Sequence, residues 1–293
     1  MNKLPHQFNF HMEHEKCIFS ATVGSRLIGA DNQNSDIDTI SFYSHKININ
    51  PFFEYPVGNE IVSIENTDVM NETCNVLLAN FASMILKPKD LQSNTYSQII
   101  KHLAAIKFNN IKVIDKERYN IYYDWLCAPG NGFNFWQQSL NAYNNFWNSM
   151  PTKDCNWSQK FDNINDEHIN KKELWYTFNE GYYPKVDAKL GYDVKYVSWM
   201  LTDIILIHHI LWQDHIIDER ELDFIKHVKE HKVEWEQVQN FKIDIWKNAR
   251  KSVESPMSSY LLGKGFNIQV AKSKNKYGMK AFIELLENLG VTQ

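Results

Sequence analysis

Two aspartates separated by a single residue are the side chains in this sequence best suited to chemistry. Asp36 and Asp38 lie in the stretch "VGSRLIGADNQNSDIDTISFY", residues 23–43. On an extended strand, side chains two positions apart point to the same face, about 6.6 Å apart along the strand. Carboxylates placed in this way can hold a pair of Mg²⁺ or Mn²⁺ ions about 3.5–4 Å apart. The spacing therefore predicts metal-assisted transfer of a phosphoryl or nucleotidyl group.

A Gly-Ser turn lies shortly before the two aspartates. Gly24 and Ser25 follow an apolar run over residues 17–23, and such a turn offers backbone N–H groups and a hydroxyl to a triphosphate. Arg26 comes next, and its guanidinium suits bidentate contacts to a phosphate or to the acceptor. Capping of the loop, or pairing with a surface acid, is the alternative role for Arg26. Together these residues predict a polyphosphate held against two metal ions.

The segments around this motif indicate a small sheet with helices. Runs of β-branched and aromatic residues predict strands over residues 17–23, 35–43, 59–66 and 73–76. Apolar residues at three- and four-residue spacing predict helices over residues 77–87 and 96–108, with a further helix around 11–16. Pro88 ends the first of these. In this arrangement the two aspartates share one face of the second strand.

The second half of the chain has a different pattern. Residues 127–134, "CAPGNGFN", concentrate proline and glycine and form the expected lobe boundary. Beyond it, helical spacing of apolar residues covers residues 136–150, 196–212, 220–253 and 279–289. We therefore expect an α+β protein, with a small mixed-sheet lobe over residues 1–127 and a mainly helical lobe over residues 128–293.

Composition excludes several classes of protein. The chain has 293 residues, of which 43% are hydrophobic, so it is far from a disordered composition. Its net charge of -4 means that any contact with nucleic acid must come from a local patch. The 4 cysteines have no metal-binding spacing, which predicts free thiols and a cytoplasmic protein. The most apolar segment is interrupted by Asp203, which favours a buried helix and no membrane partner.

The order strand, Gly-Ser, short helix and SDxD resembles the DNA polymerase beta-like nucleotidyltransferases. Gly24, Ser25, Asp36 and Asp38 match that signature, and Ser35 opens its SDxD part. More narrowly, "GSRLIGADNQNSDID" is similar to the predicted nucleotidyltransferase family associated with RNA-repair ligases. The resemblance extends loosely over residues 13–257, with a specific motif only over residues 24–38.

The resemblance implies a site and a reaction. A third carboxylate on a neighbouring strand would complete the metal site, with Glu72 in that place and Asp68 or Glu65 as alternatives. Catalysis and metal binding would fall to Asp36, Asp38 and Glu72, and nucleotide binding to Gly24, Ser25, Arg26 and Ser35. The chain departs from the family pattern after the motif, where Ile40 and Ser41 replace an Arg-Gly pair. These departures bear on acceptor recognition rather than on the metal-binding core.

We therefore expect transfer of an NMP from an NTP to an acceptor hydroxyl. The resemblance points to an RNA end as the acceptor, while a protein hydroxyl or a small molecule is also compatible with the modest acidity of the chain. The alternative is a non-catalytic nucleotide-binding or interaction protein that keeps the fold, such as a repair partner or a toxin–antitoxin component. An acid within metal-bridging range of the two aspartates would favour catalysis.

Other polar features have two interpretations each. His11 and His14 could share a helical face and bind zinc, although a polar helix surface is the simpler explanation. One of His208, His209 and His215 could contact a base or relay a proton. The simpler explanation is that they are ordinary buried histidines with hydrogen-bond partners. A segment near the end of the sequence could hold a nucleic-acid backbone and stack a base, or be a solvated loop; it contains Lys272, Lys274, Lys276, Tyr277 and Lys280.

Overall fold

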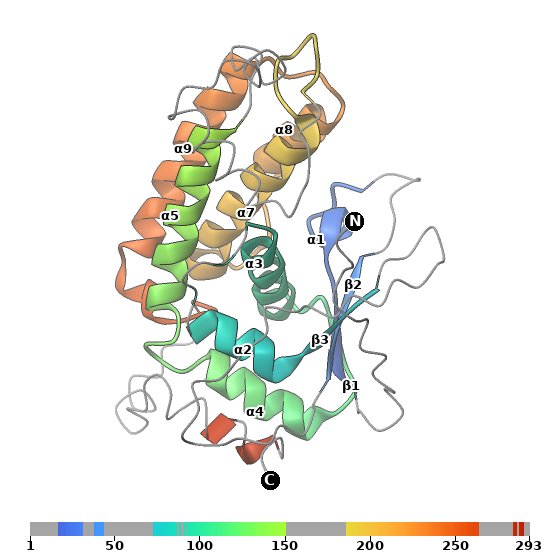
Figure 1. Ribbon diagram of the computed structural model, residues 1–293, viewed down its shortest axis with the longest axis vertical. Coiled ribbons are helices and arrows are strands. Elements are labelled where there is room, and N and C mark those ends of the chain that lie inside the picture. The colour runs from blue at the N-terminus through green and yellow to red at the C-terminus, as the bar shows by residue number, and fades with distance from the viewer. Residues whose placement is uncertain are drawn as a thin grey trace, which may run out of the picture.

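A small sheet followed by a mainly helical region makes up the fold, as expected for an α+β protein (Figure 1). The computed structural model describes residues 17–31, 38–43, 73–86, 88, 91, 93–150, 186–263, 284–285 and 287–289. In Figure 1 the sheet and α1 lie on one side of α3 and α7, and α5 and α9 lie on the other. Helices α3 and α7 therefore form the layer that joins the two sides.

The sheet is mixed and has four strands in the order β3-β2-β1-β4. The central strand β1 (Cys17–Thr22) pairs antiparallel with both β2 (Thr39–Tyr43) and β4 (Ile111–Val113). Strand β3 (Thr73–Leu77) pairs parallel with β2. The strands expected over residues 17–23 and 73–76 are thus confirmed, and β4 was not expected. The strand expected over residues 59–66 and the helix around residues 11–16 lie outside the described residues.

The second expected strand begins later than its sequence pattern suggests. Strand β2 starts at Thr39, and Asp38 precedes it. Residues 32–37 lie outside the described part of the chain, so the orientation of Asp36 relative to Asp38 stays a prediction.

Four helices accompany the sheet in the described part of the first half of the chain. They are α1 (Gly24–Leu27), α2 (Leu78–Leu86), α3 (Ser93–Lys107) and α4 (Lys116–Leu126). Helices α2 and α3 confirm the two predicted from apolar spacing. Helix α4 begins after Asp115, whose carboxylate accepts a hydrogen bond from the backbone N–H of Arg118 at 3.1 Å.

The described residues of the second half form four longer helices, three of which pack against α7. These are α5 (Phe133–Ser149), α7 (Val194–Trp212), α8 (Glu219–Lys229) and α9 (Trp235–Val253), followed by the short 3₁₀ helix η2 (Pro256–Ser259). By length and composition α7 is the one helix among the described residues that could cross a membrane, yet 83% of its apolar stretch is buried inside the protein. It is a core helix, as its sequence predicts.

The helical spacing over residues 220–253 resolves into two helices rather than one. The chain leaves α8 through His231, whose φ of 60° is a left-handed conformation incompatible with a continuing α-helix. Helix α9 then starts at Trp235 with its own capping interaction, in which the side chain of Gln237 accepts from the backbone N–H of Glu234 at 3.0 Å.

One continuous cluster of buried apolar residues runs from the sheet into the helices. Helix α3 packs against β1, α5 and α7, so it links the two halves of the chain. At the expected lobe boundary, α4 ends at Leu126 and α5 begins at Phe133. The division into two lobes at this loop stays a prediction.

Candidate functional site

A cavity of about 390 Å³ lies where α1 and the start of β2 face α3, α7 and α8. Its size falls in the range usual for small-molecule sites, about 300–1,000 Å³. It is lined by Val23, Gly24, Ser25, Ile28, Asp38, Thr39, Ile40, Gln98, Lys101, Lys195, Trp199, Thr202 and Lys229. The cavity therefore contains residues of the Gly-Ser turn, one of the two aspartates, and side chains from helices far away in sequence.

The Gly-Ser turn and Asp38 are brought together by the pairing of β1 with β2. Thr22, the last residue of β1, is opposite Thr39, the first residue of β2. One step further, the backbone N–H of Val23 donates to the carbonyl oxygen of Asp38 at 2.9 Å. The antiparallel register thus places the residue after Val23 beside the Asp38 side chain.

Gly24 is required at this point for two reasons. Its φ of +69° is left-handed, which glycine adopts without steric cost. A Cβ atom on this residue would lie 1.7 Å from Oδ2 of Asp38. The absence of a side chain therefore leaves the space that the Asp38 carboxylate occupies at the cavity wall.

Three lysines from three different helices line the opposite part of the cavity: Lys101 of α3, Lys195 of α7 and Lys229 of α8. The ammonium of Lys229 donates to the carbonyl oxygen of Ala30, just after α1, at 3.4 Å. Burial lowers the pKa of Lys229, and the charge of Lys101 lowers it further, against the opposing effect of Asp31 and Asp38. The ammonium groups of Lys101 and Lys229 are thus close enough to repel each other.

Trp199 adds an aromatic face to the cavity. Trp199 is 39% exposed, although most residues of α7 are buried. The ammonium of Lys195 lies 4.8 Å from the centroid of the Trp199 ring, and that of Lys101 lies 5.6 Å from it. Both cations sit within the range of cation–π attraction, so the ring helps to hold them at the cavity.

The described lining of the cavity carries more positive than negative charge and includes an unsatisfied acceptor. Asp38 is the one acidic residue among the described lining residues, against three lysines. Oε1 of Gln98, also in the lining, is buried with no hydrogen-bond partner in the described part of the chain. Such a site favours a ligand that carries several negative charges together with a hydrogen-bond donor.

The structure places some predicted site residues at this cavity and others elsewhere. Gly24, Ser25 and Asp38 line it, whereas Arg26 is exposed and does not belong to the described lining. The remaining predicted residues lie outside the described part of the chain: Ser35, Asp36, Glu65, Asp68 and Glu72. The roles predicted for all of these residues, including those that line the cavity, stay predictions.

Sequence reasoning missed the lysines and the tryptophan of the cavity. Lys101, Lys195 and Lys229 come from three helices, each of which carries other polar side chains. No spacing in the sequence connects them. The partial signal was Trp199, an aromatic residue on the outer face of an otherwise buried helix.

The predicted histidine group at the end of α7 does not line this cavity. His209, His215 and Asp218 present possible metal-ligand atoms within 4.8 Å of one another. However, Nδ1 of His209 lies 2.8 Å from the carbonyl oxygen of His215, and Nε2 lies 2.8 Å from Oε2 of Glu221. Because both ring nitrogens face oxygen acceptors, His209 has no lone pair directed at a metal. The group is a hydrogen-bonded network that joins α7 to α8.

Charge and burial act in opposite directions on these histidines. Burial works to lower the pKa of His209, but the hydrogen bond and charge of Glu221 outweigh it, and the pKa is raised. Burial lowers the pKa of the neighbouring His208, whose Nδ1 shares a hydrogen bond with the hydroxyl of Ser252 at 2.8 Å. His11, His14 and the basic segment over residues 271–280 lie outside the described residues.

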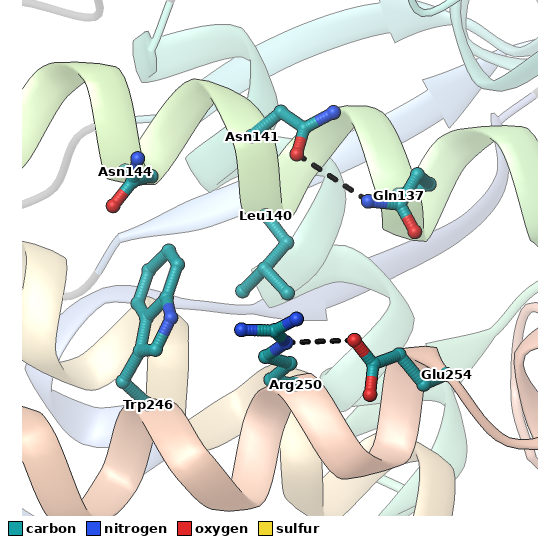
Figure 2. A pocket seen from close by; sticks show the side chains of 7 residues that line it. All are labelled: Gln137, Leu140, Asn141, Asn144, Trp246, Arg250 and Glu254. Carbon is teal, nitrogen blue, oxygen red and sulfur yellow. Dashed lines mark hydrogen bonds and ion pairs between the residues drawn. The ribbon is translucent and has the colours of Figure 1, made fainter.

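A second pocket, of about 250 Å³, lies between α5 and α9 (Figure 2). Its charged residues are already paired, because Nε of Arg250 donates to Oε1 of Glu254 at 2.7 Å. Its amides also bond to each other, since Nε2 of Gln137 donates to Oδ1 of Asn141 at 3.3 Å. The first cavity, with its converging cations, is therefore the better candidate for chemistry.

The first cavity has to be interpreted from its own geometry. No protein-family model, curated protein or solved structure gives a significant match to the chain. Gly24 leaves the backbone of the turn accessible, and the Asp38 carboxylate lies beside it. With the three lysine ammonium groups opposite, this arrangement can bind an extended polyphosphate.

Proposed function

We propose that the protein is a metal-dependent nucleotidyltransferase that moves an NMP from an NTP to an acceptor hydroxyl. One observation carries the proposal: Gly24, Ser25 and Asp38 of the predicted nucleotide motif line the same cavity as three lysines. The resemblance of residues 24–38 to nucleotidyltransferases supports it as well. A positively charged cavity opposite the motif is the environment that a triphosphate requires.

In this proposal the lysines bind the phosphates of the NTP. Burial and, to a smaller extent, the charge of Lys101 lower the pKa of Lys229, so the two ammonium groups repel each other in the free protein. A polyphosphate between them replaces that repulsion with attraction to both. Ser25 offers its hydroxyl from the other side of the cavity, and Gly24 lets the ligand approach the backbone.

Asp38 belongs to the proposed metal site. Its carboxylate is a hard oxygen donor of the kind that Mg²⁺ and Mn²⁺ prefer, and the missing Cβ of Gly24 leaves room for it at the cavity wall. Asp36 and Glu72 are the other ligands that the proposal assigns. When bound, the metal neutralises phosphate charge and makes the acceptor hydroxyl a better nucleophile. The lysines stabilise the negative charge of the departing pyrophosphate.

The character of the cavity supports an RNA end as the acceptor. The resemblance of residues 24–38 points to such an acceptor, and the partly exposed ring of Trp199 offers it a surface on which a base can stack. A cytoplasmic location fits this proposal, because the ligands it requires are found there.

The test is a transfer assay with each α-labelled NTP, Mg²⁺ or Mn²⁺ and a pool of RNA oligonucleotides. We expect labelled RNA with the wild-type protein and with the control variant Asp244→Asn, which changes an exposed acid of α9. We expect none with Asp38→Asn. Nucleotide binding without transfer to any acceptor would instead support the non-catalytic, nucleotide-binding alternative, and absence of nucleotide binding would overturn the proposal.

A further inference from the structure

A buried carboxylate lies behind the wall of the cavity. Asp203 of α7 is 1% exposed, and a buried ionised carboxylate needs partners to offset the loss of hydration. Its Oδ2 accepts a hydrogen bond from the hydroxyl of Tyr143 on α5 at 2.7 Å. Its Oδ1 is buried and has no hydrogen-bond partner in the described part of the chain. One oxygen of Asp203 is therefore fixed, and the other acts through its charge.

Lys101 supplies the opposite charge. Its Nζ lies 3.8 Å from Oδ1 of Asp203, beyond the about 2.7–3.2 Å of an N–H···O hydrogen bond. The two side chains are 16% and 2% exposed, respectively, so water screens their attraction only weakly. Lys101 also lines the cavity. Its ammonium group thus has Asp203 on one side and the cavity on the other.

We infer that Asp203 is a positioning residue that holds the Lys101 ammonium at the cavity wall for contact with a bound polyphosphate. The inference rests on the polyphosphate-binding part of the proposed function. Lysine has a long, flexible stem, and fixing it costs conformational entropy. Asp203 fixes it before the ligand arrives, so that less order has to be created on binding.

The surroundings of Lys101 show why such an anchor is needed. The charge of Lys101 contributes to the lowered pKa of Lys229, so a second ammonium group stands close by in the same cavity. The negative charge of Asp203 behind Lys101 acts against the repulsion between the two ammonium groups. Asp203 provides that charge without entering the cavity, since it does not belong to the described lining.

Tyr143 keeps the anchor in place. Its side chain is buried, and burial raises its pKa well above the usual range, with the charge of Asp203 raising it further. The phenol therefore stays protonated, and its O–H donates a hydrogen bond to Oδ2 of Asp203. Helices α3, α5 and α7 meet at this set of three residues, so the position of Lys101 is linked to the packing of the helical region.

The experiment is a double-mutant cycle on binding of inorganic tripolyphosphate to the full chain, measured by titration calorimetry. Lys101→Met removes the ammonium, and Asp203→Asn keeps the shape and an oxygen for Tyr143 but removes the charge. We expect roughly tenfold weaker binding for Lys101→Met and roughly fivefold weaker binding for Asp203→Asn. The double variant should bind no more weakly than Lys101→Met alone, because Asp203 acts through Lys101.

Lys195→Met is the matched control, since Lys195 lines the same cavity but forms no ion pair with Asp203 among the described contacts. In the double variant, the factors by which Lys195→Met and Asp203→Asn weaken tripolyphosphate binding should multiply, because the two residues act independently. The inference is wrong if the Asp203→Asn loss also multiplies with that of Lys101→Met, if Asp203→Asn binds as tightly as the wild type or more tightly, or if the wild type does not bind tripolyphosphate.

Two further measurements keep the result interpretable. If Asp203→Asn does not fold, as judged by circular dichroism, Tyr143→Phe replaces it, with a smaller loss and the same dependence on Lys101. Transfer of label from an NTP is measured separately. If the effects of Lys101→Met and Asp203→Asn on binding are coupled but no label is transferred, the proposed function is refuted and the role of Asp203 is supported. If label is transferred but the two effects are independent, the proposed function stands and the role of Asp203 is refuted.

Discussion

His102 should make the folded protein sensitive to acid. Its side chain is completely buried, and it stands in an aromatic cluster whose nearest described rings include Phe42, at 4.3 Å between ring centroids, and Phe81, at 4.7 Å. Nε2 shares a hydrogen bond with the hydroxyl of Tyr122 at 3.0 Å, while Nδ1 is buried with no hydrogen-bond partner in the described part of the chain. Burial lowers the pKa of His102 from 6.5 to about 3. The ring is therefore neutral in the folded protein.

The sign and size of the effect follow from linkage. Because the folded pKa is depressed, the unfolded chain binds a proton that the folded chain does not between pH 6.5 and about 3. The free energy of unfolding should fall by about 1.4 kcal/mol per pH unit over that window. Between pH 7.5 and pH 4.5 the loss from His102 alone comes to about 2.7 kcal/mol. Above about pH 7.5 the contribution is nearly constant.

The assay is urea unfolding of the wild type and of His102→Phe at several pH values from 7.5 to 4.5. Other groups titrate in both proteins, so their effects cancel in the difference between the two free energies of unfolding. The phenylalanine leaves the Tyr122 hydroxyl without its partner, which gives an offset that does not depend on pH. We expect the variant to gain about 2.7 kcal/mol on the wild type between pH 7.5 and pH 4.5. Parallel curves over this window would refute a neutral, buried His102.

Two other predictions test the turn and the histidine network. In Gly24→Ala the new Cβ would lie 1.7 Å from Oδ2 of Asp38 at a left-handed φ, so we expect a lower melting temperature and loss of tripolyphosphate binding; unchanged binding would contradict the described contact. In Glu221→Gln the raised pKa of His209 is lost. A pKa of His209 that is raised in the folded state stabilises the protein below pH 6.5, and this stabilisation disappears as pH rises through the folded pKa. The melting temperatures of Glu221→Gln and wild type should therefore differ most near pH 6 and converge in alkali. A difference that grows with pH would rule out the paired imidazolium.

Local patterns in the sequence were sufficient for much of the fold. Apolar residues at helical spacing correctly indicated α2, α3, α5, α7 and α9, because a helix that packs on a core must repeat its buried face. The run of apolar, β-branched and aromatic residues before Gly24 indicated β1, because such residues favour a strand that is buried in a sheet. The break between α8 and α9 was not visible, since it depends on the left-handed backbone at His231, and the residue type there does not demand that conformation.

Strand β4 illustrates another limit of sequence patterns. It is only three residues long and becomes a strand because its backbone pairs with β1, which lies far earlier in the chain. A segment so short has no periodicity of its own to recognise. Its pairing partner is a property of the folded chain.

The candidate site divides in the same way. Gly24, Ser25 and Asp38 could be selected from sequence because their roles depend on residue type and on spacing along one segment. Lys101, Lys195 and Lys229 could not, because a lysine on a helix has no distinguishing pattern and its meaning depends on where three helices meet. Sequence alone selected residues of the turn that the structure then places in the cavity lining. The convergence of α3, α7 and α8 on the cavity decided which cations face them, since it depends on contacts between residues distant along the chain.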